Sequence, residues 1–375
     1  MEPSNLKVLF LTDIPSPYRV SFFNELGKLC NLTVLFERKA SKNREKSWHS
    51  EEFSNFTPIF LKGIKLNANK RINLDVRKYL KEDLFDLFII GGYSTPTGIL
   101  AIEVLNFKKI PFILNADGGV VRKESKLKTM IKRHFISSAK YWLSTGNNTS
   151  KYLEHYEAIK KNIYKYPFTS FSRQDVLNTI VSENDKNKIK RELNITEEKV
   201  ILTVGQFIPR KGIDVLLKAC IDLPKNYGIY IIGGDPPRQY TDFKERNKLN
   251  NVHFINFLDK DELKKYYYCS DVFVLPTRED VWGLVINEAM ANGLPVITTE
   301  KCVAGLEMIK EKENGFIIPV DDNDTLSDKI KQIMVNESLR KNMAVNSLKK
   351  AKEYTIENMA ATHLNILETV LKKEN

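Results

Sequence analysis

The stretch that does most to decide the fold is Pro276-Thr-Arg-Glu-Asp-Val-Trp-Gly-Leu-Val-Ile-Asn-Glu-Ala-Met290. The largely apolar residues 271–275 just before it are typical of a buried strand, and residues 284–291, with Glu, Ala and Met, favour a helix. Gly283 would then stand at the start of that helix, where unpaired backbone N–H groups and the positive end of the helix dipole attract an anion. The pattern predicts a strand–loop–helix unit with an anion site at its loop.

Two carboxylates accompany this predicted anion site. Asp280 lies in the loop above the strand, and Glu288 lies one turn into the helix. The arrangement suits a phosphorylated sugar, with backbone amides for the phosphate and carboxylates for the hydroxyls. The alternative is an ordinary buried strand–loop–helix unit in which Glu288 caps or pairs locally.

A second segment favours the sugar-phosphate interpretation. The apolar strand Ile201-Leu-Thr-Val204 runs into Gly205-Gln-Phe-Ile-Pro-Arg-Lys-Gly212, and residues 213–219 follow at helical spacing. Arg210 and Lys211 therefore arrive together at a helix start, where two cations suit a diphosphate leaving group. A basic helix start without ligand is the alternative. No G-x-x-x-x-G-K-[ST] and no G-x-G-x-x-G spacing is present here, which disfavours a Walker loop and nicotinamide or flavin binding.

Several motifs in this order resemble glycosyltransferase family four. The resemblance rests on the two segments above and on three further blocks, Ile231-Ile-Gly-Gly-Asp-Pro236, Gly293-Leu-Pro-Val-Ile297 and Asn314-Gly-Phe-Ile317. Residues 12–19 and 115–119 look like a bacterial polysaccharide-biosynthesis branch of the family. The resemblance implies an α/β GT-B fold: two Rossmann-like domains with parallel sheets facing across a cleft, and a C-terminal helix crossing back to the first domain. It also implies sugar transfer from nucleotide diphosphates with retention of the anomeric configuration.

The chain departs from the family pattern at two positions. The usual Glu-x7-Glu pair begins here with Asp280, and the usual Gly-Arg of the phosphate loop is Gly205-Gln206. We expect Arg210, beside Lys211, to supply the missing cation.

The resemblance assigns the donor site to the second domain. It implies that Glu288 binds the nucleotide ribose, that Asp280 contacts the donor sugar, and that Lys211 and Arg210 bind the diphosphate. We predict further donor contacts at the phosphate loop, at the wall of the base pocket and at the helix start: Gly205, Gln206, Gly233, Gly234, Phe257, Leu258, Gly283, Leu284 and Val285.

The first domain is expected to hold the acceptor. Two prolines stiffen Pro15-Ser-Pro-Tyr-Arg19, whose Ser16, Tyr18 and Arg19 are candidate acceptor contacts, together with Tyr93 in the loop 91–98. Asp117, before two glycines, would orient the attacking hydroxyl or contact the donor sugar, so it joins Asp280, Lys211 and Arg210 as a candidate catalytic residue. The alternatives are stacking and salt-bridging at a helix start for Tyr18 and Arg19, and a turn-forming role for Asp117.

Alternating strand and helix patterns indicate two domains of similar size in this chain of 375 residues. We predict an acceptor domain at 1–170, joined by a helix at 355–373 that begins near a cap at Thr355, and a donor domain at 196–354. The boundary falls at 168–196. The four cysteines show no C-x-x-C spacing, and the run Asp321-Asp-Asn-Asp324 is more typical of a helix cap than of a metal site.

The net charge of +11 calls for an anionic partner. Much of the excess lies in residues 122–135, which predict an amphipathic basic helix able to lie on an anionic membrane surface. A solvated helix whose apolar stripe packs on the sheet is the alternative. Nucleic acid is disfavoured, since no binding motif is found. No apolar run is long enough to cross a bilayer, so we expect a cytoplasmic protein, peripheral at most on the inner face of the membrane.

The resemblance implies a retaining glycosyltransferase of hexosyltransferase type. Its donor would be a nucleotide sugar, with UDP-sugar favoured, and its acceptor a glycan or polyprenyl-diphosphate-linked glycan in capsule or lipopolysaccharide synthesis. We expect no cofactor and no required metal, because Lys211, Arg210 and helix amides would neutralise the diphosphate. The alternatives are a nucleotide-sugar epimerase on the same scaffold and a non-catalytic sugar-nucleotide binding protein.

Overall fold

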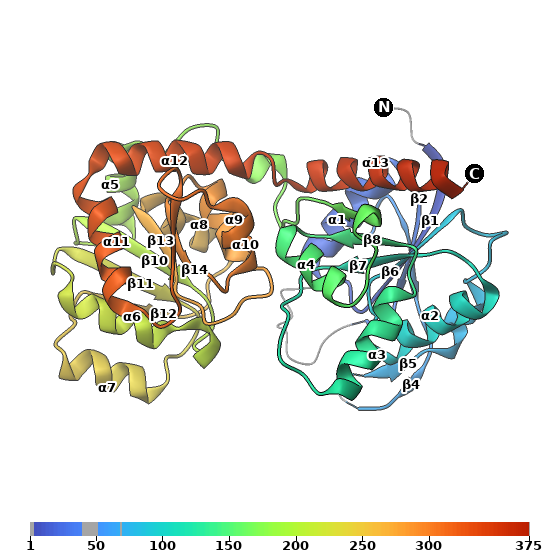
Figure 1. Ribbon diagram of the computed structural model, residues 1–375. Helices are drawn as coiled ribbons and strands as arrows, with labels where there is room; N and C mark the ends of the chain where they lie inside the picture. Colours follow the sequence, from blue (N-terminus) through green and yellow to red (C-terminus); the bar gives the residue numbers. More distant parts are fainter. Residues whose placement is uncertain (1–3, 40–51, 68–69, 375) are drawn as a thin grey trace. The chain divides into compact units, whose positions relative to one another are not determined.

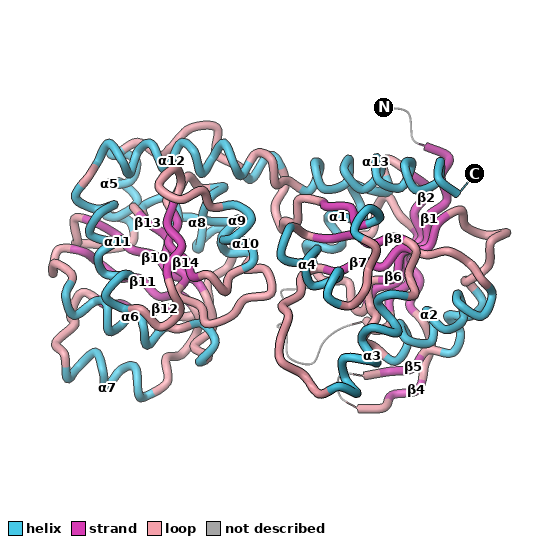
Figure 2. Tube along the Cα trace, in the orientation of Figure 1, coloured by secondary structure: helices cyan, strands magenta, loops and turns pink. Residues whose placement is uncertain are grey.

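The computed structural model describes residues 4–39, 52–67 and 70–374, which form two compact units. The first unit comprises residues 1–170 together with 354–375, and the second comprises residues 171–353. Each unit holds a parallel β-sheet surrounded by helices (Figures 1 and 2). The predicted α/β class with two Rossmann-like sheets is confirmed.

Among the described residues, the first unit is built on a seven-stranded parallel sheet with the order β3-β2-β1-β6-β7-β8-β9. Its central strands are nearly continuous apolar runs, as expected when both faces of a parallel sheet are covered. A short antiparallel pair, β4 and β5, lies outside this sheet. The strand bounds are β1 Ser4–Thr12, β2 Cys30–Phe36, β3 Thr57–Phe60, β4 Ile64–Lys65, β5 Arg71–Ile72, β6 Leu87–Ile90, β7 Ile113–Ala116, β8 Tyr141–Ser144 and β9 Ile163–Lys165.

The helices of the first unit include the last helix of the chain. They are α1 Pro17–Gly27, α2 Pro96–Lys108, α3 Lys126–Ser137, α4 Asn147–His155 and α13 Ile356–Glu374. Helix α13 packs against α1, and its start is capped by Thr355, whose Oγ1 accepts a hydrogen bond from the Asn358 N–H at 3.3 Å. The final helix thus returns to the first unit.

The second unit is built on a six-stranded parallel sheet with the order β12-β11-β10-β13-β14-β15. The strand bounds are β10 Lys199–Val204, β11 Tyr227–Ile232, β12 Val252–Ile255, β13 Val272–Leu275, β14 Val296–Thr299 and β15 Gly315–Ile318. Its helices are α5 Glu183–Glu192, α6 Ile213–Ala219, α7 Arg238–Arg246, α8 Lys260–Cys269, α9 Leu284–Ala291, α10 Val303–Met308, α11 Asn323–Val335 and α12 Glu337–Ala351.

The segment 171–195, which the sequence left between the domains, lies in the second unit, because α5 packs on α8 there. Asp322 is the N-cap of α11, since its Oδ1 accepts from the Thr325 N–H at 2.9 Å. The acidic run therefore caps a helix, as the sequence indicated.

Each sheet reverses its strand order once, and the reversal points locate the functional loops. In the second sheet β10 leads to β11 and β12 on one side, while β13 leads to β14 and β15 on the other. The first sheet reverses in the same way between β1 and β6. Ligands of such sheets bind where neighbouring loops diverge, beyond the carboxyl ends of the strands at the reversal. The loops that follow β10 and β13 are the two segments singled out from the sequence.

Candidate functional site

The loop after β10 is held tightly against its neighbours. A Cβ added to Gly233 would lie 1.9 Å from the Gly205 carbonyl oxygen, and one added to Gly212 would lie 1.9 Å from the Pro276 carbonyl oxygen. Gly212 also has a φ of +66°, in the left-handed region that favours glycine. Side chains at these positions would therefore drive the loops apart.

Hydrogen bonds then tie the loop after β10 to the loop after β13. The Arg210 carbonyl accepts from the Arg278 N–H and from the Thr277 hydroxyl, each at 2.8 Å. Between these loops three charged side chains meet. Lys211 Nζ lies 2.6 Å from Asp280 Oδ2, and Arg210 Nη1 lies 3.4 Å from Asp280 Oδ1. The two predicted cations, Arg210 and Lys211, therefore both contact the first motif acid, Asp280.

The start of α9 adjoins this charged cluster. Gly283 caps the helix with a φ of +98°, and a Cβ on it would lie 2.8 Å from Cys302 Sγ and 3.7 Å from Asp280 Cγ. Leu284 and Val285 are the first two residues of the helix. A helix N-terminus and two cations thus lie around one carboxylate, an arrangement able to bind a diphosphate.

The second motif acid, Glu288, is held by a tyrosine. Tyr267 of α8 donates its hydroxyl hydrogen to Glu288 Oε2 at 3.0 Å. Burial raises the pKa of the Glu288 carboxyl, and the hydrogen bond from Tyr267 opposes that shift. Tyr267 fixes the rotamer of Glu288 and was missed from the sequence, because it lies 21 residues away on another helix.

The predicted wall of the base pocket is an exposed aromatic ring beside a glycine. Phe257 is 55% exposed, and a Cβ on Gly234 would lie 2.7 Å from its ring. Gly234 has a φ of +98°. Leu258 is half-buried, and Gln206 is exposed in the loop after β10. An open ring of this kind can stack on a flat ligand.

Arg278, in the segment 276–290, has a structural role that the sequence did not predict. Arg278 donates two hydrogen bonds to Asp214, at 2.6 and 3.0 Å, one to Asp321 at 2.7 Å and one to the Pro209 carbonyl at 2.6 Å. Burial of Asp214 opposes ionisation, but the bonds from Arg278 outweigh it and lower the pKa of that carboxyl. Arg278 therefore clamps the loop that carries Arg210 and Lys211.

In the first unit the candidate carboxylate Asp117 accepts from three donors. It pairs with Arg19, and its Oδ1 accepts from Asn115 Nδ2 at 2.7 Å and from the Tyr166 hydroxyl at 3.0 Å. Asp117 itself is half-buried, with 36% of its side chain exposed. Tyr166 was missed, because it lies 49 residues from Asp117, and Asn115, two residues before Asp117 in the segment 115–119, was given no role.

Two of the predicted acceptor contacts are buried. Ser16 and Arg19 are each only 3% exposed. The Arg19 guanidinium lies 5.8–5.9 Å from the ring centres of Phe10, Tyr18 and Phe168. The structure thus places Arg19 as the partner of Asp117 among aromatic rings, which was the alternative weighed from the sequence. Asp117 and the half-buried Tyr18 stay open to a ligand.

Tyr93 belongs to a tyrosine network that reaches the basic helix α3. Its hydroxyl lies 3.0 Å from that of Tyr152, against whose ring Gly119 packs. Close by, Tyr156 donates to Glu124 at 3.2 Å, and Glu124 pairs with Lys132 at 2.7 Å. The bonds to Lys132 and then Lys128 lower the pKa of the Glu124 carboxyl to about 2.

Helix α3 exposes most of its apolar stripe. Leu127, Met130 and Ile131 are 66%, 62% and 49% exposed, and Phe135 is half-buried against the core. The alternative in which the whole stripe packs on the sheet is therefore wrong. Within residues 4–39, 52–67 and 70–374, no helix combines the length and the apolar character needed to cross a membrane.

All four cysteines are buried and unpaired. Across the part of the chain that the structure describes, no group of three or more His, Cys, Asp and Glu side chains is arranged to hold a metal ion.

The segment that contains these loops is similar to known proteins. Residues 185–350, all in the second unit, match the family described as Glycosyl transferases group 1. The chain is 26% identical over 270 residues to an uncharacterised glycosyltransferase of Methanocaldococcus jannaschii, covering 72% of this chain and 71% of that protein. It is 27% identical over 224 residues to the lipopolysaccharide glucosyltransferase WaaG of Escherichia coli, covering 57% of this chain and 55% of WaaG.

The fold also has solved counterparts. HepE from Anabaena, crystallised in complex with UDP, superposes with a TM-score of 0.75 at 15% identity, covering 97% of this chain and 99% of HepE. At that identity the likeness shows the fold alone, and it is the GT-B fold. Together with the match over residues 185–350, it leads to one conclusion: the second unit carries a glycosyl transferases group 1 domain, and the chain is a glycosyltransferase.

Proposed function

We propose that the chain transfers a sugar from a nucleotide-diphosphate sugar to a glycan or lipid-linked acceptor in the synthesis of a cell-surface polysaccharide. We infer UDP as the nucleotide, because HepE was crystallised with UDP. The acceptor class follows the name of WaaG, a lipopolysaccharide glucosyltransferase.

One observation carries the proposal: Lys211 and Arg210 converge on Asp280 beside the first turn of α9. Asp280 balances the two cations. A bound diphosphate would take over the cations and the helix amides, and Asp280 would then be available for a sugar hydroxyl. Positive groups held in advance where negative charge develops on the leaving group lower the barrier to bond breaking.

The remaining donor contacts follow from the same unit. Glu288, oriented by Tyr267, is assigned to the ribose hydroxyls, and the exposed ring of Phe257 to the base. In the first unit Asp117 is assigned to the acceptor or donor sugar, with Arg19, Asn115 and Tyr166 holding it in place.

We propose that transfer retains the anomeric configuration and requires no metal ion. Same-face departure and attack, with the leaving phosphate accepting the proton of the acceptor hydroxyl, needs no strong protein base. Lys211, Arg210 and the amides of α9 supply the neutralising charge that a metal ion supplies elsewhere. If EDTA abolished transfer, the metal-free mechanism would be wrong. A product of opposite anomeric configuration would contradict retention.

The test is a transfer assay with UDP, GDP and ADP sugars and the matched pair Lys211→Ala and Lys218→Ala. Lys218 lies on the following helix and is exposed. We expect Lys211→Ala to reduce turnover by ~10²–10³-fold, as loss of one charge-stabilising donor does, and Lys218→Ala to leave it unchanged. Equal turnover in the two variants would reject the phosphate assignment. Sugar epimers formed without any acceptor would instead indicate the epimerase.

A membrane role for α3 is proposed on a separate observation. Leu127, Met130 and Ile131 are exposed next to lysines of the same helix, so the helix offers apolar side chains to the lipid and cations to acidic headgroups. We expect the chain to sediment with vesicles containing acidic lipid at low salt and not with neutral vesicles. Met130→Asp should release it, whereas Val335→Asp, at an exposed apolar residue of the second unit, should not. Unchanged sedimentation of Met130→Asp would refute this role.

A further inference from the structure

The second unit contains a cavity at the end of its sheet opposite the donor loops. Its volume is about 450 Å³, and Asp271 lies in its wall. Asp271 precedes β13, whereas Asp280 follows the carboxyl end of that strand. Four residues of strand span about 13 Å, so the cavity is a separate place from the donor site. We call it the Asp271 pocket. Its walls come from α5, α12 and the segment after α9 and include Ile180, Lys186, Leu294, Arg340 and Ala344.

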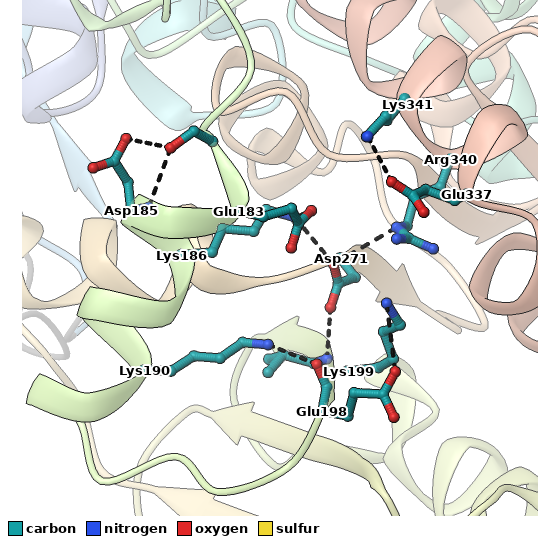
Figure 3. A network of polar contacts seen from close by, with 12 residues as sticks. Glu183, Asp185, Lys186, Lys190, Glu198, Lys199, Asp271, Glu337, Arg340 and Lys341 are labelled. Carbon is teal, nitrogen blue, oxygen red and sulfur yellow. Dashed lines mark hydrogen bonds and ion pairs between the residues drawn. The ribbon is translucent and has the colours of Figure 1, made fainter.

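The polar wall of the Asp271 pocket carries the cations Lys186 and Arg340, and Lys190 lies close to Asp271 outside the lining. Asp271 is 2% exposed, and its Oδ1 lies 3.0 Å from Lys186 Nζ and 3.7 Å from Arg340 Nε (Figure 3). The side chains of Lys186 and Arg340 are 12% and 6% exposed. Lys190, 7% exposed, donates to the Glu198 carbonyl at 2.7 Å, and its charge also acts on Asp271.

These buried charges do not balance. Two buried cations, Arg340 and Lys190, and the partly buried Lys186 surround one buried carboxylate. The Asp271 Oδ2 already accepts from the Val200 N–H at 2.9 Å. Two further carboxylates, Glu183 and Glu337, lie 3.9 Å from Lys186 Nζ and 2.5 Å from Lys341 Nζ, but their side chains are 49% and 61% exposed, so solvent screens these pairs. Buried charge is costly unless it is paired. The Nε of Arg340 is too far from Asp271 for a hydrogen bond.

The rest of the pocket is apolar, with Ile180, Leu294 and Ala344 among its lining. A cavity of this size with apolar walls and a few convergent polar groups has the character of a small-molecule site. Asn292, also in the lining, has an Oδ1 that is buried without a hydrogen-bond partner. A ligand with an anionic group and an apolar body would meet both kinds of wall.

We propose that the Asp271 pocket binds a small organic anion with an apolar body, its anionic group pairing with Arg340 and with Lys341 at the rim. The site is independent of donor binding, so it stands whether or not the proposed transfer reaction is correct.

The test uses phenyl phosphate as the probe, titrated calorimetrically into the full chain, with inorganic phosphate and phenol as the separate halves. We expect phenyl phosphate to bind more tightly than either half. Lys211→Ala, which alters the donor loops, should bind it as the wild type does. Arg340→Gln should weaken binding at least ~10-fold, as loss of a hydrogen bond to a charged group does. Lys349→Gln, the same charge change at an exposed position of α12, should have no effect.

Because Arg340 is buried, a second variant keeps the test decisive if Arg340→Gln does not fold. Ala344→Leu fills part of the cavity without removing a charge and keeps a strong helix former in α12. It should also weaken binding. Undetectable binding to the wild type, binding lost in Lys211→Ala, or binding unchanged in both Arg340→Gln and Ala344→Leu would each overturn the proposal.

Discussion

Asp280 competes with the donor for the same two cations, which gives Asp280→Asn an unusual expected outcome. The carboxylate lies 2.6 Å from Lys211 Nζ and 3.4 Å from Arg210 Nη1, with Asp280 and Lys211 side chains only 12% and 13% exposed. A diphosphate must displace this ion pair. We therefore expect Asp280→Asn to bind UDP more tightly than the wild type while transferring sugar more slowly.

The size of the effect follows from the burial of the pair. Exposed ion pairs contribute up to about 1 kcal/mol, whereas removing one partner of a pair withdrawn from water costs more, because it leaves the other charge uncompensated. Arg210 is 44% exposed, so solvent screens its attraction to Asp280. A competing interaction of about 1.4 kcal/mol corresponds to a ~10-fold change in Kd. We expect UDP to bind about 10-fold more tightly to Asp280→Asn.

Titration calorimetry with UDP measures the affinity, and initial transfer rates measure turnover. Glu279→Gln is the matched control, since it removes the same charge one residue away and leaves the Lys211–Asp280 pair in place. Its UDP affinity should stay close to that of the wild type. UDP binding that weakened in Asp280→Asn would show that Asp280 does not hold the cations against the diphosphate.

Three further changes test other parts of the structure. Gly283→Ala should destabilise by about 1–2 kcal/mol through its positive φ alone, whereas Gly205→Ala, whose Cβ would make only ordinary contacts at 3.5 Å, should unfold near the wild-type temperature. Burial raises the pKa of Glu37 from 4.5 to about 7, so its ionisation costs stability as pH rises through that interval. Glu37→Gln should therefore be more stable than the wild type by about 3 kcal/mol near pH 8, with the gain vanishing near pH 4 in thermal unfolding. Arg278→Ala breaks the pair with Asp214, about one third exposed, and should cost about 1 kcal/mol in urea unfolding; an unchanged midpoint would contradict the clamp.

Local patterns predicted the parts of the structure that depend on neighbouring residues. The unit 271–291 could be read from an apolar strand, a glycine and a helix-forming run, and the helix forms at Leu284–Ala291 as expected. Thr355 could be recognised because a cap acts within one turn. The signal is weaker for β9 and β12, whose short runs Ile-Tyr-Lys and Val-His-Phe-Ile mix polar with apolar residues.

Contacts between distant residues could not be predicted. Arg278 and Asp214 are 64 residues apart, and Tyr166 and Asp117 are 49 apart. Only the folded sheet brings them together. The burial of Arg19 was also beyond the sequence, because arginine is mostly exposed unless it is paired, and its partner Asp117 is 98 residues away.

Because α13 belongs to the first unit, the second unit can complete its fold before the first unit does. Residues 171–353 are contiguous, whereas the first unit needs residues from both ends of the chain. On the ribosome, the second unit has all of its residues before the first unit receives its last helix. Until then α1 lacks the helix that covers it, including Met359, Leu364 and Leu367, which are buried against the body of the unit. A chain truncated before residue 355 should therefore contain a complete second unit and a first unit whose uncovered apolar residues chaperones must protect.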